Sequence, residues 1–297
     1  MERADFMTYR LRKLSFLFFS ILTIVIFYSP LRLLMVTSLQ YDEMYSHIIL
    51  IPVVSGYFMF IERGTIFSKT RYAFAPGIIL IIAALVLYLS GMTYENNLDQ
   101  NDYLSLMTFS SIIFWTGGFV LFYGVQALRN ASFPFLFLIF MIPLPGLLAH
   151  GIISLLQRAS TEVSYVFFKI TGVPVLREGF VFHLPGISVE VAEQCSGIRS
   201  SLSLFITSII AGKLFLSTGW RRAILALAVF PITIMKNGVR IVSLSLLGAY
   251  VDERILSSTL HRRGGIPFFI FALLLLFPVL WSLRRSEKKM SSDLASF

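Results

Sequence analysis

Long apolar segments recur through almost the whole of this 297-residue chain, and only short polar stretches separate them. Eight such segments can be counted, at residues 14–36, 47–61, 73–91, 104–125, 131–149, 197–217, 223–250 and 265–283. A helix needs about 20 apolar residues to cross the hydrocarbon core of a bilayer, and most of these segments reach that length. The sequence therefore predicts an all-α integral membrane protein with about eight transmembrane helices.

The composition excludes an ordinary soluble domain, because 56% of the residues are hydrophobic, 14% are charged and the mean hydropathy is +0.79. The net charge of +9 does not indicate a nucleic-acid partner, since the basic residues are spread between the apolar segments. The first segment follows Arg10, Arg12 and Lys13 like a signal peptide, but it continues to about Val36 without a cleavage site. We interpret it as a retained span in contact with the lipid bilayer.

The distribution of charge also predicts an orientation. An even number of spans places both termini on one side, and most of the basic residues then fall on that same side. Basic loops are typical of the cytoplasmic face, so we expect cytoplasmic N- and C-termini. The stretch before Ser196 consequently lies at the opposite, outer boundary of the membrane.

Residues 150–195 form the one long segment between predicted spans, five and six, of a single multipass domain over residues 1–297. Apolar residues at helical spacing over 152–170 predict an amphipathic helix along the interface. Alternating apolar residues from Val173 to Val191, interrupted by Gly172, Glu178-Gly179 and Leu184-Pro185-Gly186, predict a small β-hairpin-like insertion. This extracytoplasmic element leads directly to residue 195. Pro143 and Pro145 should kink or end the fifth span.

Cys195 is the single cysteine of the chain, and it immediately precedes the sixth apolar segment. A helix N-terminus favours the reactive thiolate, and Arg199, one turn deeper on the same face, would favour it further. The alternative is that Cys195 is a small hydrophobic residue at a packing position. Both interpretations are compatible with the residue pattern alone.

Arg240 is an ionisable residue inside an apolar segment, and such residues are functional candidates by default. It lies about 26 Å along a helix from Ala223, which brings it near the outer edge of the membrane and to the level of Cys195. The alternative is an arginine that extends to the lipid headgroups. His261, in the outer loop before the last span, is an acid or base candidate that competes with His47, His150 and His183.

No metal-binding motif of the HxxH, CxxC or HExxH type occurs, and neither does a nucleotide-binding glycine loop. We therefore expect no metal and no cofactor. A polar cluster from Asp42 to His47 is consistent with substrate binding or with interfacial anchoring. The pattern does not determine an oligomeric state.

Three ordered blocks resemble the exosortases, membrane cysteine transpeptidases grouped with the archaeosortases. The blocks are Val191-Ala192-Glu193-Gln194-Cys195-Ser196-Gly197-Ile198-Arg199-Ser200, then Lys236-Asn237-Gly238-Val239-Arg240-Ile241, then His261-Arg262-Arg263-Gly264-Gly265. Tyr45-Ser46-His47, Ile51-Pro52 and Ile142-Pro143-Leu144-Pro145 are also similar to the family, so the resemblance covers nearly the whole chain. An additional C-terminal domain of longer members has no counterpart here.

The resemblance implies a thiol protease and transpeptidase of a bacterial inner (plasma) membrane, with catalytic Cys195, Arg240 and His261 facing the periplasm. Its partners would be exported proteins with a C-terminal sorting tail, made of a short motif, a transmembrane helix and a basic cluster. Cleavage through a thioacyl-enzyme would transfer them to a surface anchor. Arg199, Asn237 and His47 are the supporting or substrate-binding candidates. Two alternatives are a multipass transporter and a membrane acyltransferase that uses Cys195.

Overall fold

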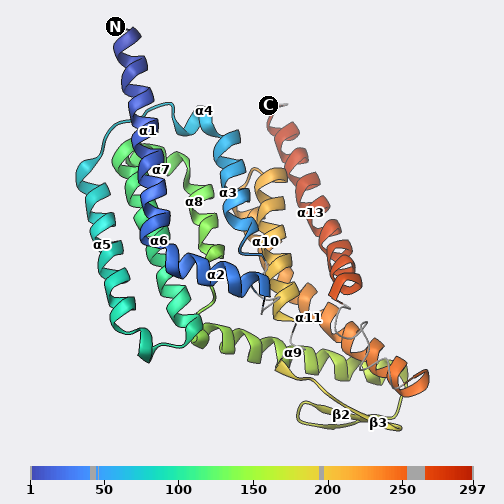
Figure 1. Ribbon diagram of the computed structural model, residues 1–297. Helices are drawn as coiled ribbons and strands as arrows, with labels where there is room; N and C mark the ends of the chain where they lie inside the picture. The colour runs from blue at the N-terminus through green and yellow to red at the C-terminus, as the bar shows by residue number, and fades with distance from the viewer. Residues whose placement is uncertain (1, 41–44, 46, 194–196, 253–264, 296–297) are drawn as a thin grey trace. The chain divides into compact units, whose positions relative to one another are not determined.

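The computed structural model describes residues 2–40, 45, 47–193, 197–252 and 265–295 (Figure 1). These residues form two compact units, Met1–Ala149 and His150–Phe297, and each is described by itself. The single domain expected over residues 1–297 stays a prediction.

The first unit is entirely helical among its described residues, as its five apolar segments predict. Its helices are α1 (Glu2–Ile26), α2 (Tyr28–Gln40), α3 (Leu50–Ile61), α4 (Arg63–Ile66), α5 (Phe74–Thr93), η1 (Glu95–Asn97), α6 (Gln100–Tyr123), α7 (Val125–Asn130), α8 (Ser132–Phe137) and η2 (Leu138–Met141).

The first apolar segment is two helices rather than one straight span, because α1 and α2 meet at an angle of 72° at Phe27. Pro30 has no backbone N–H, so the carbonyl of Ile26 cannot receive the usual helical hydrogen bond from it. The hydroxyl of Tyr88, on α5, donates to that carbonyl at 3.4 Å instead. Phe27 itself is fully buried, which fixes the bend inside the unit.

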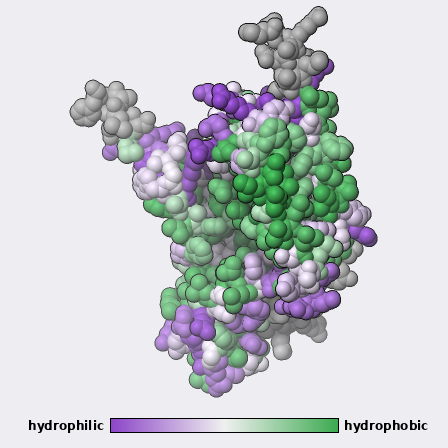
Figure 2. Space-filling model, turned by 90° about the vertical axis from the view of Figure 1, so that its left-hand side faces the viewer, coloured by the Kyte–Doolittle hydropathy of each residue, from purple (hydrophilic) through white to green (hydrophobic). Residues whose placement is uncertain are grey.

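Helix α6 is the centre of the first unit. Of its most apolar 18-residue stretch 61% is buried, against 17% for α5, which therefore presents most of its side chains outward. Figure 2, which views the molecule from the α5 side, shows a broad hydrophobic area there. Aromatic side chains pack around the last turns of α6, where Phe119 contacts Phe16, Tyr123 and Phe135. An outward apolar face of this size is what a lipid-embedded helix requires.

The fifth apolar segment ends earlier than expected, at Met141, because prolines 143 and 145 break it as predicted. The break is held by α6. Ser105 Oγ donates to the carbonyl of Pro143 at 2.7 Å, and the backbone N–H of Gly146 donates to Asp102 Oδ1 at 2.7 Å. A carboxylate at this point caps the helix that starts at Gly146.

The second unit combines helices with a small sheet. Its elements are α9 (Gly146–Thr171, which starts at the end of the first unit), β1 (Leu176–Glu178), β2 (Val181–Leu184), β3 (Ile187–Glu190), α10 (Ile198–Phe215), α11 (Gly219–Tyr250) and α13 (Gly265–Ala295). The strands form an antiparallel meander in the order β1-β2-β3. The structure thus confirms the β-hairpin-like insertion and the helix before it. That helix is longer at its start than the expected 152–170.

Helix α9 is amphipathic, but with its polar side inward. Gln157, Ser160, Thr161 and Ser164 are all buried, as are Leu156 and Phe168, whereas several other apolar side chains lie outside. Leu147, Leu155 and Ile170 are 87%, 61% and 75% exposed. Exposed apolar side chains of this kind are typical of a helix that contacts lipid along part of its surface.

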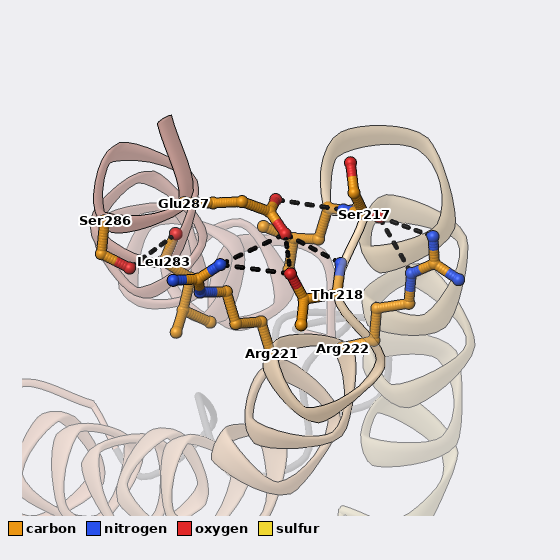
Figure 3. Close-up of polar contacts among 8 residues, drawn as sticks. Ser217, Thr218, Arg221, Arg222, Leu283, Ser286 and Glu287 are labelled. Atoms are coloured by element: carbon orange, nitrogen blue, oxygen red, sulfur yellow. Dashed lines mark hydrogen bonds and ion pairs between the residues drawn. The ribbon is translucent and has the colours of Figure 1, made fainter. Parts of the chain in front are cut away.

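Helices α10, α11 and α13 pack around an apolar core that includes Leu204, Leu225 and Ala272. Glu287, near the end of α13, binds the start of α11 (Figure 3). Its carboxylate accepts hydrogen bonds from the backbone N–H groups of Ser217 at 3.0 Å and Thr218 at 2.8 Å, and from the Thr218 hydroxyl. The buried guanidinium of Arg221 lies 3.3 Å from the same carboxylate. We call this group the Glu287 latch.

Within the described part of the chain, five helices are long and apolar enough to cross a membrane on their own, namely α5, α6, α10, α11 and α13. Counting each of two bent helix pairs as one span, α1 with α2 and α8–η2 with α9, gives up to seven. Helix α3 is apolar but has only 12 residues, as the short second segment led us to expect. The all-α multipass architecture with a small β insertion is confirmed.

Candidate active site

The predicted site residues fall into three groups. Arg199 lies in α10, and Asn237 and Arg240 lie in α11, all in the second unit. His47 is half-buried in the first unit, just before α3. Cys195 and His261 lie outside the described residues, so the convergence of Cys195, Arg240 and His261 stays a prediction. The structure does describe the segments that enter and leave residue 195.

Gly197 starts the helix that follows Cys195. Its φ of +76° lies in the left-handed region that glycine adopts without steric cost. Its carbonyl receives hydrogen bonds from Ser200 Oγ at 3.0 Å and from the backbone N–H of Ser201 at 3.0 Å. A β-carbon at position 197 would lie 3.1 Å from Asn237 Oδ1 and 3.4 Å from Lys236 Nζ. Both the backbone conformation and the contact with α11 therefore select glycine.

The partners of Gly197 on α11 are buried polar side chains. Asn237 is 0% exposed and Lys236 is 2% exposed. Lys236 Nζ donates a short hydrogen bond to Ser200 Oγ, in the first turn of α10. The next residue, Gly238, permits close packing on α9, since a β-carbon there would lie 2.7 Å from Val163 Cγ1. The ammonium of Lys236 and the amide of Asn237 thus lie inside a helix-packing interface. Burial of such groups lowers stability unless they form hydrogen bonds.

Helix α9 completes the polar interior with the side chains that it turns inward. Asn237 Nδ2 donates to Ser160 Oγ at 3.0 Å. Gln157 Nε2 donates to the backbone carbonyl of Val191 at 2.7 Å. Val191 precedes Cys195 by four residues and Gly197 follows it by two. Buried hydrogen bonds and close packing therefore hold the chain on both sides of the cysteine.

Positive charge gathers at this end of the α10–α11 pair. Arg240 follows Lys236 by four residues, so the two lie one turn apart on the same side of α11, and Arg240 is half-buried. Arg199, in the first turn of α10, is exposed. The N-terminus of α10 adds the positive end of a helix dipole. Such a field favours anions, including a thiolate and the oxyanion that forms when a carbonyl is attacked.

The three-stranded sheet is attached to α9 by an exposed ion pair. Arg177 on β1 donates two hydrogen bonds to Glu162, at 2.7 and 2.9 Å. These bonds lower the pKa of Glu162 and raise that of Arg177 from their usual values. Phe182 and Phe168 pack beneath the pair in the apolar core of the sheet.

His183 has partners on both ring nitrogens within the sheet. Its Nδ1 lies 2.8 Å from Ser188 Oγ, and its Nε2 lies 3.4 Å from Glu178 Oε2. This arrangement suits a structural role on the β2–β3 hairpin. His183 is accordingly a poorer acid or base candidate than the sequence alone suggests.

Sequence reasoning missed the contributions of Gln157 and Ser160, and it treated Lys236 only as a neighbour of Arg240. A signal for the first two exists, since the polar residues at 157, 160, 161 and 164 recur at the spacing of one helix face. The signal for Lys236 is a charge within a long apolar run.

Comparison with protein-family models matches residues 36–278 to the family described as transmembrane exosortase. The match includes the segments around Cys195, Lys236–Arg240 and His261, and it extends over most of the chain. Comparisons with curated proteins and with solved structures returned no match.

Proposed function

Because this chain belongs to the transmembrane exosortase family, a family of transpeptidases, we propose that it cleaves the C-terminal sorting tail of exported membrane-anchored proteins. The tail consists of a short motif, a transmembrane helix and a basic cluster. The cleaved protein is then passed to a surface anchor. Substrate and enzyme meet in the lipid bilayer, because both are membrane helices at the point of cleavage.

The proposed reaction has two steps. The Cys195 thiolate attacks the scissile carbonyl, and the resulting oxyanion collapses with release of the tail's amine, which takes up a proton. This leaves the exported protein as a thioester on Cys195. A second nucleophile then attacks the thioester carbonyl, loses its proton and displaces the thiolate. One peptide bond is thereby exchanged for a bond to the acceptor.

The proposed roles follow the chemistry of each side chain. Arg240 stabilises the oxyanion or positions the sorting motif, because its planar guanidinium donates to two acceptors at once. His261 gives a proton to the leaving amine and takes one from the acceptor. Arg199 supports the thiolate. Asn237 holds Gly197, and His47 is a substrate-binding candidate.

One observation supports this proposal above the others. The hydrogen bond from Gln157 to Val191 and the contact of Gly197 with Asn237 hold the chain on either side of Cys195. A cysteine that serves only as a packing residue has no need of buried polar supports on both flanks, whereas a nucleophile must be held in place to react. The adjacent positive charges add the field that a thiolate requires.

The proposed location is a bacterial inner membrane, with both termini in the cytoplasm and the site facing the periplasm. Because Cys195 is the one cysteine in the chain, a thiol reagent reports on it alone. A membrane-impermeant maleimide, applied to cells whose outer membrane has been made permeable, should label the protein. Labelling that requires lysis of the inner membrane would overturn the orientation.

The decisive experiment is co-expression with a protein that carries a C-terminal motif, span and basic tail. The active enzyme should shorten this substrate at its C-terminus, and Cys195→Ala should accumulate the uncut form. Ser203→Ala is a matched control, because the Ser203 hydroxyl bonds to the Arg199 carbonyl within its own helix. Normal processing by Cys195→Ala would remove the nucleophile assignment. A substrate that gains an acyl group at full length would indicate the acyltransferase alternative.

A further inference from the structure

Two charged side chains are buried within the described ranges, Arg221 and Lys236, both on α11. Arg221 belongs to the Glu287 latch and pairs with its carboxylate. Lys236 has no carboxylate partner among the residues the structure describes, and its ammonium bonds to a serine hydroxyl instead. A buried cation compensated only by a neutral group is unfavourable for folding. Its presence beside the start of α10 therefore calls for another reason.

The hydrogen bonds around Lys236 have a definite direction. Lys236 Nζ donates to Ser200 Oγ, and Ser200 Oγ donates to the carbonyl of Gly197 at 3.0 Å. Because the Ser200 proton is directed to that carbonyl, the hydroxyl offers its lone pair to the lysine, which acts as the donor. This arrangement describes a lysine that donates and a serine that positions the backbone. It does not describe a serine nucleophile with a lysine base.

Covalent geometry sets an upper limit on the distance between this cation and the cysteine. A β-carbon on Gly197 would lie 3.4 Å from Lys236 Nζ, and Gly197 follows Cys195 by two residues. Two peptide units separate their α-carbons by at most about 7.6 Å. The sulfur of Cys195 therefore lies within about 15 Å of the ammonium. At an effective dielectric constant of about 20, unit charges at that distance interact by about 1.1 kcal/mol, which corresponds to just under one pKa unit.

We propose that Lys236 is a positioning residue for Cys195, whose buried ammonium both fixes the first turn of α10 through Ser200 and stabilises the cysteine thiolate. The catalytic part of this proposal rests on the proposed function, in which the Cys195 thiolate is the nucleophile. Other charged groups also act on Cys195: Arg240 on α11, Arg199 on α10, Glu193 just before the cysteine and Glu190 on β3. These groups are unchanged in every variant at position 236, so a difference in the thiol pKa between variants reports the effect of Lys236.

The test measures Cys195 directly. Full-length protein in lipid nanodiscs is alkylated with iodoacetamide over a range of pH, and the midpoint of the rate profile gives the thiol pKa, because the thiolate is the reacting form. Lys236→Met should raise this midpoint by about one unit, and Lys236→Arg should restore it. Lys213→Met, at the opposite end of α10, is the control and should leave it unchanged.

Two further measurements separate charge from structure. Lys236→Gln keeps a donor for Ser200 but carries no charge, so its midpoint should rise as in Lys236→Met. Lys236→Met should unfold at the same temperature as the wild type or higher, since an apolar side chain replaces a buried cation. A purely structural lysine predicts the opposite result, a lower unfolding temperature with an unchanged midpoint.

The proposal is overturned by an unchanged midpoint in Lys236→Met, by a wild-type midpoint in Lys236→Gln, or by failure of Lys236→Met to fold. None of these results bears on the proposed function, because alkylation requires no substrate. That function is tested by tail cleavage with Cys195→Ala, whatever the midpoints of the Lys236 variants.

Discussion

The two ends of the α10–α11 helix pair treat buried positive charge in opposite ways. At the loop between the helices, Arg221 meets Glu287, and the same carboxylate caps the first turn of α11 (Figure 3). At the other end, Lys236 meets Ser200 and packs against Gly197, and Arg240 follows one turn later. One end pairs its cation with a carboxylate, whereas the other places positive charge beside Gly197, two residues after Cys195.

The difference separates stability from function within one pair of helices. A carboxylate beside a buried guanidinium offsets part of the cost of burying it, which suits a contact whose role is structural. A cation left with a hydroxyl keeps its field available to an anion that appears during a reaction. A buried basic residue on α11 thus serves stability where its partner is a carboxylate and can serve function where its partner is neutral.

The largest effect should come from Arg240→Lys, at the charge-rich end. Lysine keeps the charge but loses the planar pair of donors, so tail cleavage should fall by roughly a hundredfold or more. Arg222→Lys is the matched change at the latch end, where Arg222 donates two hydrogen bonds to the Leu216 carbonyl, and it should retain cleavage. Full activity of Arg240→Lys would reduce Arg240 to a charge anchor.

Glu287→Ala should have the largest effect on stability. It removes the cap of α11 and leaves Arg221 buried without its carboxylate, so the free energy of unfolding should fall by about 3 kcal/mol. Unfolding in detergent with a denaturant gives this value, and the alkylation midpoint of Cys195 should stay where it is. A shifted alkylation midpoint together with an unchanged free energy of unfolding would contradict the assignment of stability to one end of the helix pair and function to the other.

Asn237→Asp would make the charge-rich end resemble the latch. The change keeps the shape of the side chain and puts a carboxylate beside Lys236 and Gly197. Partial neutralisation of the field should slow Cys195 alkylation at neutral pH by about tenfold. The control is Asn130→Asp, at a half-buried asparagine in the first unit, and this variant should be alkylated at the wild-type rate. An unaltered rate in Asn237→Asp would show that the local field does not govern the thiol.

The smallest effect belongs to the exposed pair of Glu162 and Arg177. Because the hydrogen bonds lower the pKa of Glu162 in the folded state, its contribution to stability is present above the carboxylate's ordinary pKa. It is lost as the pH falls through the lowered value. Hydrogen exchange of the β1 and β2 amides should therefore speed up slightly in acid, and Glu162→Gln should abolish that pH dependence. A pH dependence that survives in Glu162→Gln would assign it to another group.

The helices were predictable because apolar length alone decides what a bilayer accepts, and the break at Pro143 and Pro145 follows from the missing N–H of proline. The bend at Phe27 was harder to predict. Pro30 lies near the start of α2, where proline is tolerated, and the compensating hydroxyl of Tyr88 comes from a distant helix.

The polar interior of the candidate site depends on contacts that no local pattern contains. Gln157 bonds to Val191 across 34 positions, and Asn237 bonds to Ser160 across 77. The spacing also predicted an amphipathic helix here without deciding which of its sides faces the protein, and the hydrogen bonds of Gln157 and Ser160 decide it.

The buried polar side chains of α9 predict which of its positions tolerate substitution. In a water-soluble enzyme, the apolar face of a helix is the restricted one and the polar face varies freely. On α9, position 155 should accept any apolar side chain, whereas positions 157, 160 and 164 should accept only residues of similar size that can donate or accept a hydrogen bond. A saturation library of this helix would therefore find Leu147 and Leu155 more permissive than Gln157 or Ser160.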